Sequence, residues 1–177
     1  MNAFAFFFSR LRCATVPGYV TTALVILGLC AAPRPASAAA GPFQHFSGAW
    51  SGTGTLRQSG RAIERIRCTA NYRSRGSTGH EVDLQLRCAS DSYNFDLVGQ
   101  FQADEQNSVT GRWSEQSRNI GGTAIGRARA DSLQVHAESA GFSANLTMVT
   151  RGRRQSVSLT SLGGGQTVSA SITLHRN

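Results

Sequence analysis

Apolar and polar residues alternate with a period of two along most of the chain that follows residue 45. The clearest alternation lies in residues 62–72 and 80–88, whose apolar sets are Ile66, Cys68, Ala70 and Tyr72 in the first and Val82, Leu84, Leu86 and Cys88 in the second. This period is that of a strand with one buried face, and no helical period lasts ten residues. The pattern therefore predicts an all-β fold.

Segments of this kind recur about every twelve residues, which gives eight to ten short strands. Residues 118–130 are rich in glycine and are interpreted as a bulged strand. Because the turns between strands are short, neighbours in sequence are expected to be neighbours in the sheet. No longer repeat with matching side chains is visible, which argues against a propeller. We predict an up-and-down antiparallel β-barrel of eight to ten strands.

A barrel of the outer membrane has the same alternation, with its apolar side chains facing lipid and aromatic girdles at both interfaces. After residue 38 the chain has only two Trp and two Tyr, and it ends in Leu174, His175, Arg176 and Asn177 rather than in an aromatic residue. A water-soluble barrel is therefore favoured, and the membrane barrel is the alternative.

The first 38 residues have the organisation of a secretory signal peptide. Arg10 and Arg12 precede an apolar run over residues 20–32, and Ala36 and Ala38 are the small residues before the cut. The apolar run is shorter than the roughly 20 residues that span a membrane. We predict cleavage after Ala38 and export to the periplasm or the extracellular space.

Three alternatives remain open for this segment: a cut after Ala40, an uncleaved anchor, and lipid modification of Cys30. With the preferred cut, the chain divides into a signal peptide over residues 1–38, a short arm over 39–45 and one barrel domain over 46–177.

The length and the net charge of the mature chain further limit the kind of protein that is expected. The mature chain has 139 residues, the length of a single domain, and a formal charge of +5 once Arg10, Arg12 and Arg34 leave with the signal. The basic residues are dispersed, and no aromatic signature of nucleic-acid binding interleaves with them. We predict a solvated basic exterior, a monomer, and no specific nucleic-acid partner.

Cys68 and Cys88 are the two cysteines of the mature chain, and an even pair in an exported protein is typical of a disulfide. Both lie on the apolar faces of consecutive strands. If the hairpin turns about residues 77–79, they face each other across the strand pair, within disulfide range. A metal site is not expected, because there is no Cys-x-x-Cys and the histidines are scattered at His45, His80, His136 and His175.

The sequence contains no arrangement typical of an enzyme. Serine-hydrolase, phosphate-loop and zinc-protease motifs are absent, and the acidic side chains do not form the paired carboxylates of a glycosidase, the candidates being Asp91, Asp96, Glu115 and Asp131. We therefore predict a protein that is not an enzyme and that needs no cofactor and no metal.

Two polar clusters lie in the predicted strand region. Residues 90–92 occupy a strand junction, where an Asx turn is the simplest interpretation. The second cluster consists of Arg112, Trp113, Glu115 and Arg118. It is interpreted either as a strand with a surface ion pair or as a ligand site at the barrel mouth, with Trp113 as a platform and Arg118 for an anion.

Gly48-x-Trp50 opens the first strand of this β meander, and in this the chain resembles the calycin barrels, the lipocalin and avidin group. The resemblance implies that Trp50 closes one end of the barrel and that an arginine of the last strand, here Arg176, packs across it. The ligand contacts of lipocalins and avidins are not matched, so neither ligand transfers.

The order GAW, RCTA, RCAS is also similar to small periplasmic protease inhibitors of bacteria, which have a disulfide between the strands that follow Gly-x-Trp. That resemblance implies that residues 40–46 enter a protease cleft. The chain lacks the tryptophan-containing stretch that this family has after its second cysteine, and residues 89–97 stand there instead.

These observations lead to an exported, non-catalytic binding protein that holds a small or amphipathic ligand in the barrel or at its mouth. A protein-binding module such as a protease inhibitor acting through its N-terminal arm is the second hypothesis. A structural envelope protein without a ligand is the third.

Overall fold

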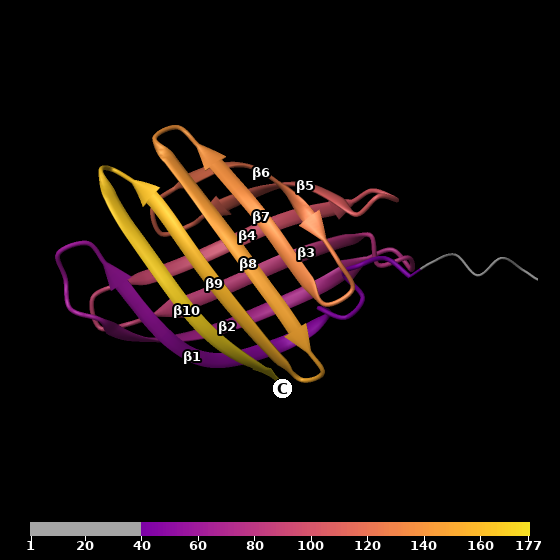
Figure 1. Ribbon diagram of the computed structural model, residues 1–177, viewed down its shortest axis with the longest axis horizontal. Helices are drawn as coiled ribbons and strands as arrows, with labels where there is room; N and C mark the ends of the chain where they lie inside the picture. The colour runs from indigo at the N-terminus through magenta and orange to yellow at the C-terminus, as the bar shows by residue number, and fades with distance from the viewer. Residues whose placement is uncertain (1–39) are drawn as a thin grey trace, which may run out of the picture. The chain divides into compact units, whose positions relative to one another are not determined.

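The computed structural model describes residues 40–177, which form ten β-strands (Figure 1). The strands are β1 (Gly48–Gln58), β2 (Glu64–Arg75), β3 (Glu81–Ala89), β4 (Asn94–Ala103), β5 (Ser108–Glu115), β6 (Ile120–Ala128), β7 (Ser132–Ser139), β8 (Phe142–Arg151), β9 (Arg154–Gly163) and β10 (Gln166–Arg176). The all-β prediction is confirmed, with a strand count at the top of the predicted range. Within these residues no helix is long and apolar enough to span a membrane. The predicted signal peptide lies outside the described residues.

The ten strands form one closed antiparallel barrel in up-and-down order, as predicted. Each strand pairs with its neighbours in sequence, and β1 pairs with β10 to close the sheet. Figure 1 shows β8, β9 and β10 crossing in front of β2, β3 and β4. Closure leaves no strand edge unpaired, which removes the usual template for edge-to-edge association.

Strand β6 differs from its prediction, because its residues pair with β5 and β7 without a bulge. The glycines instead allow the backbone of β7 to lie very close to that of β6. A Cβ atom added at Gly122 would lie 1.8 Å from the backbone oxygen of Glu138, and one added at Gly126 would lie 2.1 Å from that of Gln134. The glycine content of this segment therefore reflects tight strand contact.

The two ends of the barrel differ. One end, here called the mouth, carries the five loops that follow the odd-numbered strands, over residues 59–63, 90–93, 116–119, 140–141 and 164–165. The other, here called the closed end, carries the remaining hairpin loops and the N-terminal arm, and the chain also terminates there. In Figure 1 the β1–β2 and β9–β10 loops of the mouth lie at the left.

The N-terminal arm folds back onto the closed end. The backbone N–H of Gly41 donates to the oxygen of Thr78, and that of Phe43 donates to the oxygen of Gly79. Phe43 and Phe46 are each 1% exposed and pack in the core. The arm therefore plugs the barrel, so inhibition through residues 40–46 requires this plug to be released first.

Trp50 and Arg176 form the pair that the lipocalin resemblance implies. The two residues are register partners on β1 and β10, and the guanidinium carbon of Arg176 lies 4.6 Å from the centroid of the indole ring. Trp50 is fully buried, and its Nε1–H donates to the backbone oxygen of Phe46 at 2.9 Å. Arg176 also donates to the backbone oxygen of His45. Both side chains thus fasten the arm to the closed end.

The disulfide between Cys68 and Cys88 is present, as predicted. The cysteines are register partners on β2 and β3, with their Cα atoms 4.1 Å apart. Both are buried in the barrel interior.

A buried polar network lies at the closed end. The hydroxyl of Tyr72 donates to Oε1 of Gln155 at 2.9 Å, and the amide of Gln155 donates to the hydroxyl of Thr150 at 3.0 Å. Burial raises the pKa of Tyr72 far above its usual value, so this hydroxyl stays protonated and remains a donor. Satisfied groups of this kind are tolerated in an otherwise apolar core.

Candidate functional site

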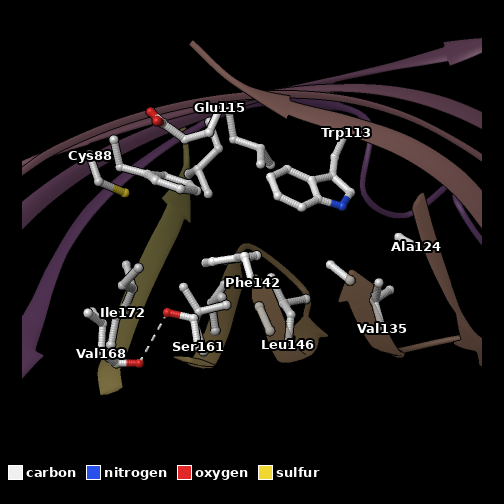
Figure 2. A pocket seen from close by; sticks show the side chains of 18 of the residues that line it. Cys88, Trp113, Glu115, Ala124, Val135, Phe142, Leu146, Ser161, Val168 and Ile172 are labelled. Atoms are coloured by element: carbon white, nitrogen blue, oxygen red, sulfur yellow. Dashed lines mark hydrogen bonds between the residues drawn. The ribbon is translucent and has the colours of Figure 1, made fainter. Parts of the chain in front are cut away.

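A cavity of about 550 Å³ occupies the interior of the barrel. Its wall is mostly apolar and includes inward residues of all ten strands. Figure 2 shows the indole of Trp113 on one side of the cavity, with Val135, Phe142 and Leu146 opposite. The indole packs against Phe142 with ring centroids 5.4 Å apart. The side chains of the barrel therefore leave part of its interior unfilled.

Small inward residues create this space. Four alanines of the strands line the cavity at positions where a larger apolar residue would fill it: Ala124, Ala137, Ala144 and Ala170. Strand number acts in the same direction, because the diameter of a barrel grows with the number of strands and even eight strands can hold one small ligand. Ten strands with small inward residues leave room for a ligand.

One hydroxyl lies within the apolar wall. Ser161 of β9 is buried and lines the cavity. Its hydroxyl donates to the backbone oxygen of Val168 at 3.5 Å, the interaction drawn dashed in Figure 2. A hydrogen bond of that length is weak. Ser161 is therefore available as a polar contact for a molecule inside the barrel.

The polar lining is concentrated at the mouth. Loop and strand-end residues there contribute guanidinium, hydroxyl and amide groups to the cavity, from Gln58, Arg61, Ser92, Tyr93, Arg118 and Gln166. The arm plugs the closed end, so these polar groups lie at the end of the barrel that the arm leaves open.

Glu115 organises the β5–β6 turn of the mouth. Its side chain is 1% exposed, and its carboxylate accepts hydrogen bonds from the backbone N–H groups of Asp96 (2.9 Å), Ser117 (3.1 Å) and Arg118 (2.8 Å). The guanidinium of Arg118 adds a charged contact at 3.2 Å. Burial alone would raise the pKa of Glu115, but these hydrogen bonds outweigh it and hold the pKa below its usual value.

Arg118 connects two loops of the mouth. It donates through Nη1 to the backbone oxygen of Asn94 at 3.1 Å, and its guanidinium carbon lies 4.5 Å from the centroid of the Tyr93 ring. Burial raises the pKa of Tyr93, against the opposing effect of the Arg118 charge. The arginine is thus held in place by Glu115 and Tyr93 while its side chain stays 40% exposed at the mouth.

The β3–β4 turn is also held by hydrogen bonds. Glu64 accepts from the hydroxyl of Ser90 at 2.7 Å and from the hydroxyl of Ser92. The hydrogen bond from Ser90 is the main cause that lowers the pKa of Glu64. Ser90 in turn accepts from the backbone N–H of Tyr93 at 3.1 Å. The turn expected here is therefore organised by serine hydroxyls rather than by Asp91, and its hydrogen bonds join the β3–β4 loop to the start of β2.

The structure brings together three of the four residues of the predicted mouth cluster. Trp113 lines the cavity with its Nε1–H on the backbone oxygen of Thr123 at 3.0 Å, and Glu115 and Arg118 lie at the mouth. Arg112 is exposed on the outer face of β5, because successive residues of a strand point to opposite sides. Sequence reasoning missed Arg61 and Tyr93, which come from other loops.

Glu115→Gln is expected to lower the free energy of unfolding by about 1–3 kcal/mol at neutral pH, since it weakens several hydrogen bonds to a buried acceptor. The folded pKa lies below the usual 4.5, so the stabilisation by the carboxylate is present above that pH and is lost as the pH falls through the folded pKa. Urea titrations at neutral and at acidic pH should therefore show the variant approaching the wild type in acid.

The exposed Glu105 of the β4–β5 turn provides the matched control. Glu105→Gln should change stability little at either pH. A Glu115→Gln deficit that is the same at both pH values would contradict the assignment of this stabilisation to the ionised carboxylate.

No protein-family model matches the chain, and no curated protein matches it. Several solved structures share its fold. Rv2717c from M. tuberculosis is 13% identical with a TM-score of 0.62, over 76% of this chain and 94% of that one. The S-type phycobiliprotein lyase CPES from Guillardia theta is 10% identical with a TM-score of 0.60, over 76% of this chain and 90% of that one. These likenesses show the fold alone, which in this chain is a closed barrel of ten antiparallel strands.

The prediction that the protein is not an enzyme is wrong. It rested on the absence of known catalytic motifs, yet a barrel of the same fold is described as a lyase. Motifs belong to families, whereas a fold of this kind supports different functions through the residues of its site. Among residues 40–177 no group of three or more His, Cys, Asp and Glu side chains is placed to hold a metal ion.

Proposed function

We propose that this protein binds a small amphipathic molecule, with its apolar body in the barrel cavity and its polar end at the mouth. The observation that carries the proposal is an apolar cavity of about 550 Å³ whose polar lining is concentrated at one end. Ligand pockets in proteins have volumes of roughly 300–1,000 Å³, apolar walls and a few convergent polar groups. Binding of this kind is the first step of either carriage or catalysis.

The polar end of the ligand would meet Arg118 and Arg61. The hydrogen bonds of Arg118 to protein groups within residues 40–177 use Nη1 among its side-chain nitrogens, which leaves Nε and Nη2 as donors for a ligand. Arginine presents a planar set of donors that matches a carboxylate or a similar anionic group. Because Glu115 fixes Arg118 from behind, the guanidinium is oriented before the ligand arrives, and little side-chain entropy is lost on binding.

Export is part of the proposal. The Cys68–Cys88 disulfide supports it, because disulfides form and persist in oxidising compartments and are rare in the cytosol. The predicted cut after Ala38 would then leave a mature chain that begins at Ala39.

Titration with anilinonaphthalene sulfonate, an amphipathic fluorescent anion, tests the cavity. We expect wild-type protein to bind it and Ala144→Trp to bind it at least tenfold more weakly, because the added indole occupies the space that the ligand needs. Ala89→Trp is the matched control, since Ala89 is exposed on the outer face of β3. Circular dichroism should show that both variants stay folded.

Equal binding by folded Ala144→Trp and wild type would place the probe outside the cavity and contradict the proposal. Native mass spectrometry of the exported protein extends the test, because it gives the mass of the mature chain and of any molecule retained in the barrel. If the measured mass of the chain still includes residues 1–38, the signal is not cleaved and this part of the proposal is wrong.

A further inference from the structure

A second hollow, of about 540 Å³, lies on the outer face of strands β2 to β5. Outward side chains from two adjacent rows of the sheet line it. Each row consists of one residue from each of the four strands, paired in register with its neighbours. The first row is Arg73, Asp83, Gln100 and Arg112, and the second row is Asn71, Gln85, Val98 and Ser114. This hollow, here called the outer groove, is separated from the barrel cavity by the sheet itself.

The outer groove has an apolar spot among hydrogen-bonding groups. Val98 is half-buried within the row of amides and hydroxyl, and Gln85 and Gln100 are exposed beside it. Amide side chains offer both donors and acceptors. An occupant would therefore meet a small apolar contact surrounded by groups that bind hydroxyls.

The charge of the outer groove is positive. Arg73 and Arg112 have no carboxylate within 4.0 Å among the described residues, whereas Asp83 is paired with Arg75 at 3.2 Å. The two unpaired arginines lie at opposite ends of one row. Three strand spacings separate their backbones, about 14 Å in all, which leaves both guanidinium groups able to reach a molecule between them.

Other parts of the barrel exterior are different. Across β1, β10, β9 and β8 two neighbouring outward rows contain no charged or amide side chain: Thr55, Ser171, Ser158 and Thr147 in one, and Thr53, Thr173, Ser156 and Val149 in the other. The outward rows beside them do contain arginines, Arg57 in one row and Arg151 and Arg154 in the other. The gathering of amides and arginines over β2 to β5 therefore does not follow from strand alternation alone.

We propose that the outer groove binds a short acidic saccharide. Amide and hydroxyl side chains suit the vicinal hydroxyls of a sugar, Val98 suits a C–H face of its ring, and Arg73 and Arg112 suit its carboxylates. The length of the arginine row suits an oligosaccharide rather than a single inorganic anion. This site is independent of the barrel ligand, because the side chains of its two rows point to the opposite side of the sheet from the cavity.

Binding of trigalacturonate, measured by calorimetry at physiological ionic strength, tests the proposal. We expect binding to wild type, a loss of at least tenfold in the double variant Arg73→Gln/Arg112→Gln, and no binding of the neutral trisaccharide maltotriose. The double variant Arg67→Gln/Arg127→Gln removes the same charge from exposed positions outside the groove and should bind as wild type does. NMR methyl shifts of Val98 should move on titration.

Several results would overturn the proposal. These are an absence of trigalacturonate binding, an equal loss in both double variants, and an equal affinity for inorganic phosphate. The first denies the site, the second indicates attraction by net charge alone, and the third indicates a general anion site. Binding of anilinonaphthalene sulfonate by the Arg73→Gln/Arg112→Gln variant should be unchanged, which distinguishes this test from that of the barrel cavity.

Discussion

Replacement of Trp50 by alanine is expected to lower the free energy of unfolding by about 3–5 kcal/mol, the usual cost of removing a fully buried tryptophan from a core. Trp50 has no exposed surface and packs at the closed end of the barrel. Its loss would open a cavity beneath the N-terminal arm. It would also leave the backbone oxygen of Phe46 without its indole donor and Arg176 without its ring. Urea or thermal unfolding of the purified variant measures the effect.

Two further variants separate these contributions. Trp50→Phe keeps an aromatic ring and removes the indole donor, so its cost should fall between those of wild type and Trp50→Ala. Arg176→Ala should cost about 0.5–2 kcal/mol through the lost cation–π contact, and a double-mutant cycle with Trp50→Ala should show coupling between the two residues. A Trp50→Ala cost below about 1 kcal/mol would mean that the closed end contributes little to the folded core.

The disulfide and the Trp50–Arg176 pair were predictable because their signals are local or carried by the family resemblance. Alternation with a period of two identified the inward residues of β2 and β3, and this placed Cys68 opposite Cys88 once the hairpin turn was located. The Gly-x-Trp resemblance then implied a partner for Trp50 at the end of the last strand, where Arg176 lies. In both cases a short-range pattern determines which side chains meet.

The mouth was less predictable, because its residues come from separate loops. Arg112 and Trp113 are adjacent in sequence but point to opposite faces of β5. Tyr93 and Arg118 are distant in sequence but in contact. The periodicity of the sequence does not predict such contacts, because they depend on the conformations of the loops at the mouth.

The existence of the cavity was also beyond the sequence pattern. Alternation shows that Ala144 and Phe142 both face inward, but not whether the rings of opposite strands meet and fill the interior. That outcome depends on the strand number, which alternation limited only to eight to ten, and on how the inward side chains pack. In the ten-stranded barrel the inward side chains leave the interior unfilled.

Removal of the disulfide in the double variant Cys68→Ala/Cys88→Ala is expected to lower the free energy of unfolding by about 3 kcal/mol, since the bridge closes a loop of 20 residues in the unfolded chain. Alanine is chosen because both positions are buried and a serine hydroxyl there would need a partner. Guanidinium titration of the variant, and of wild type with a reductant, should give the same loss of stability.

The physical origin of this effect distinguishes it from that of Trp50. The β2–β3 pair is held in register by backbone hydrogen bonds along its whole length, so the folded barrel does not need the bridge to set its geometry. The bridge acts mainly by restricting the unfolded chain. The variant should therefore bind anilinonaphthalene sulfonate with wild-type affinity under conditions where it is folded, and its dependence on denaturant should be steeper because the unfolded chain is less compact. Loss of probe binding by the folded variant would instead show that the disulfide shapes the cavity wall, to which Cys88 contributes.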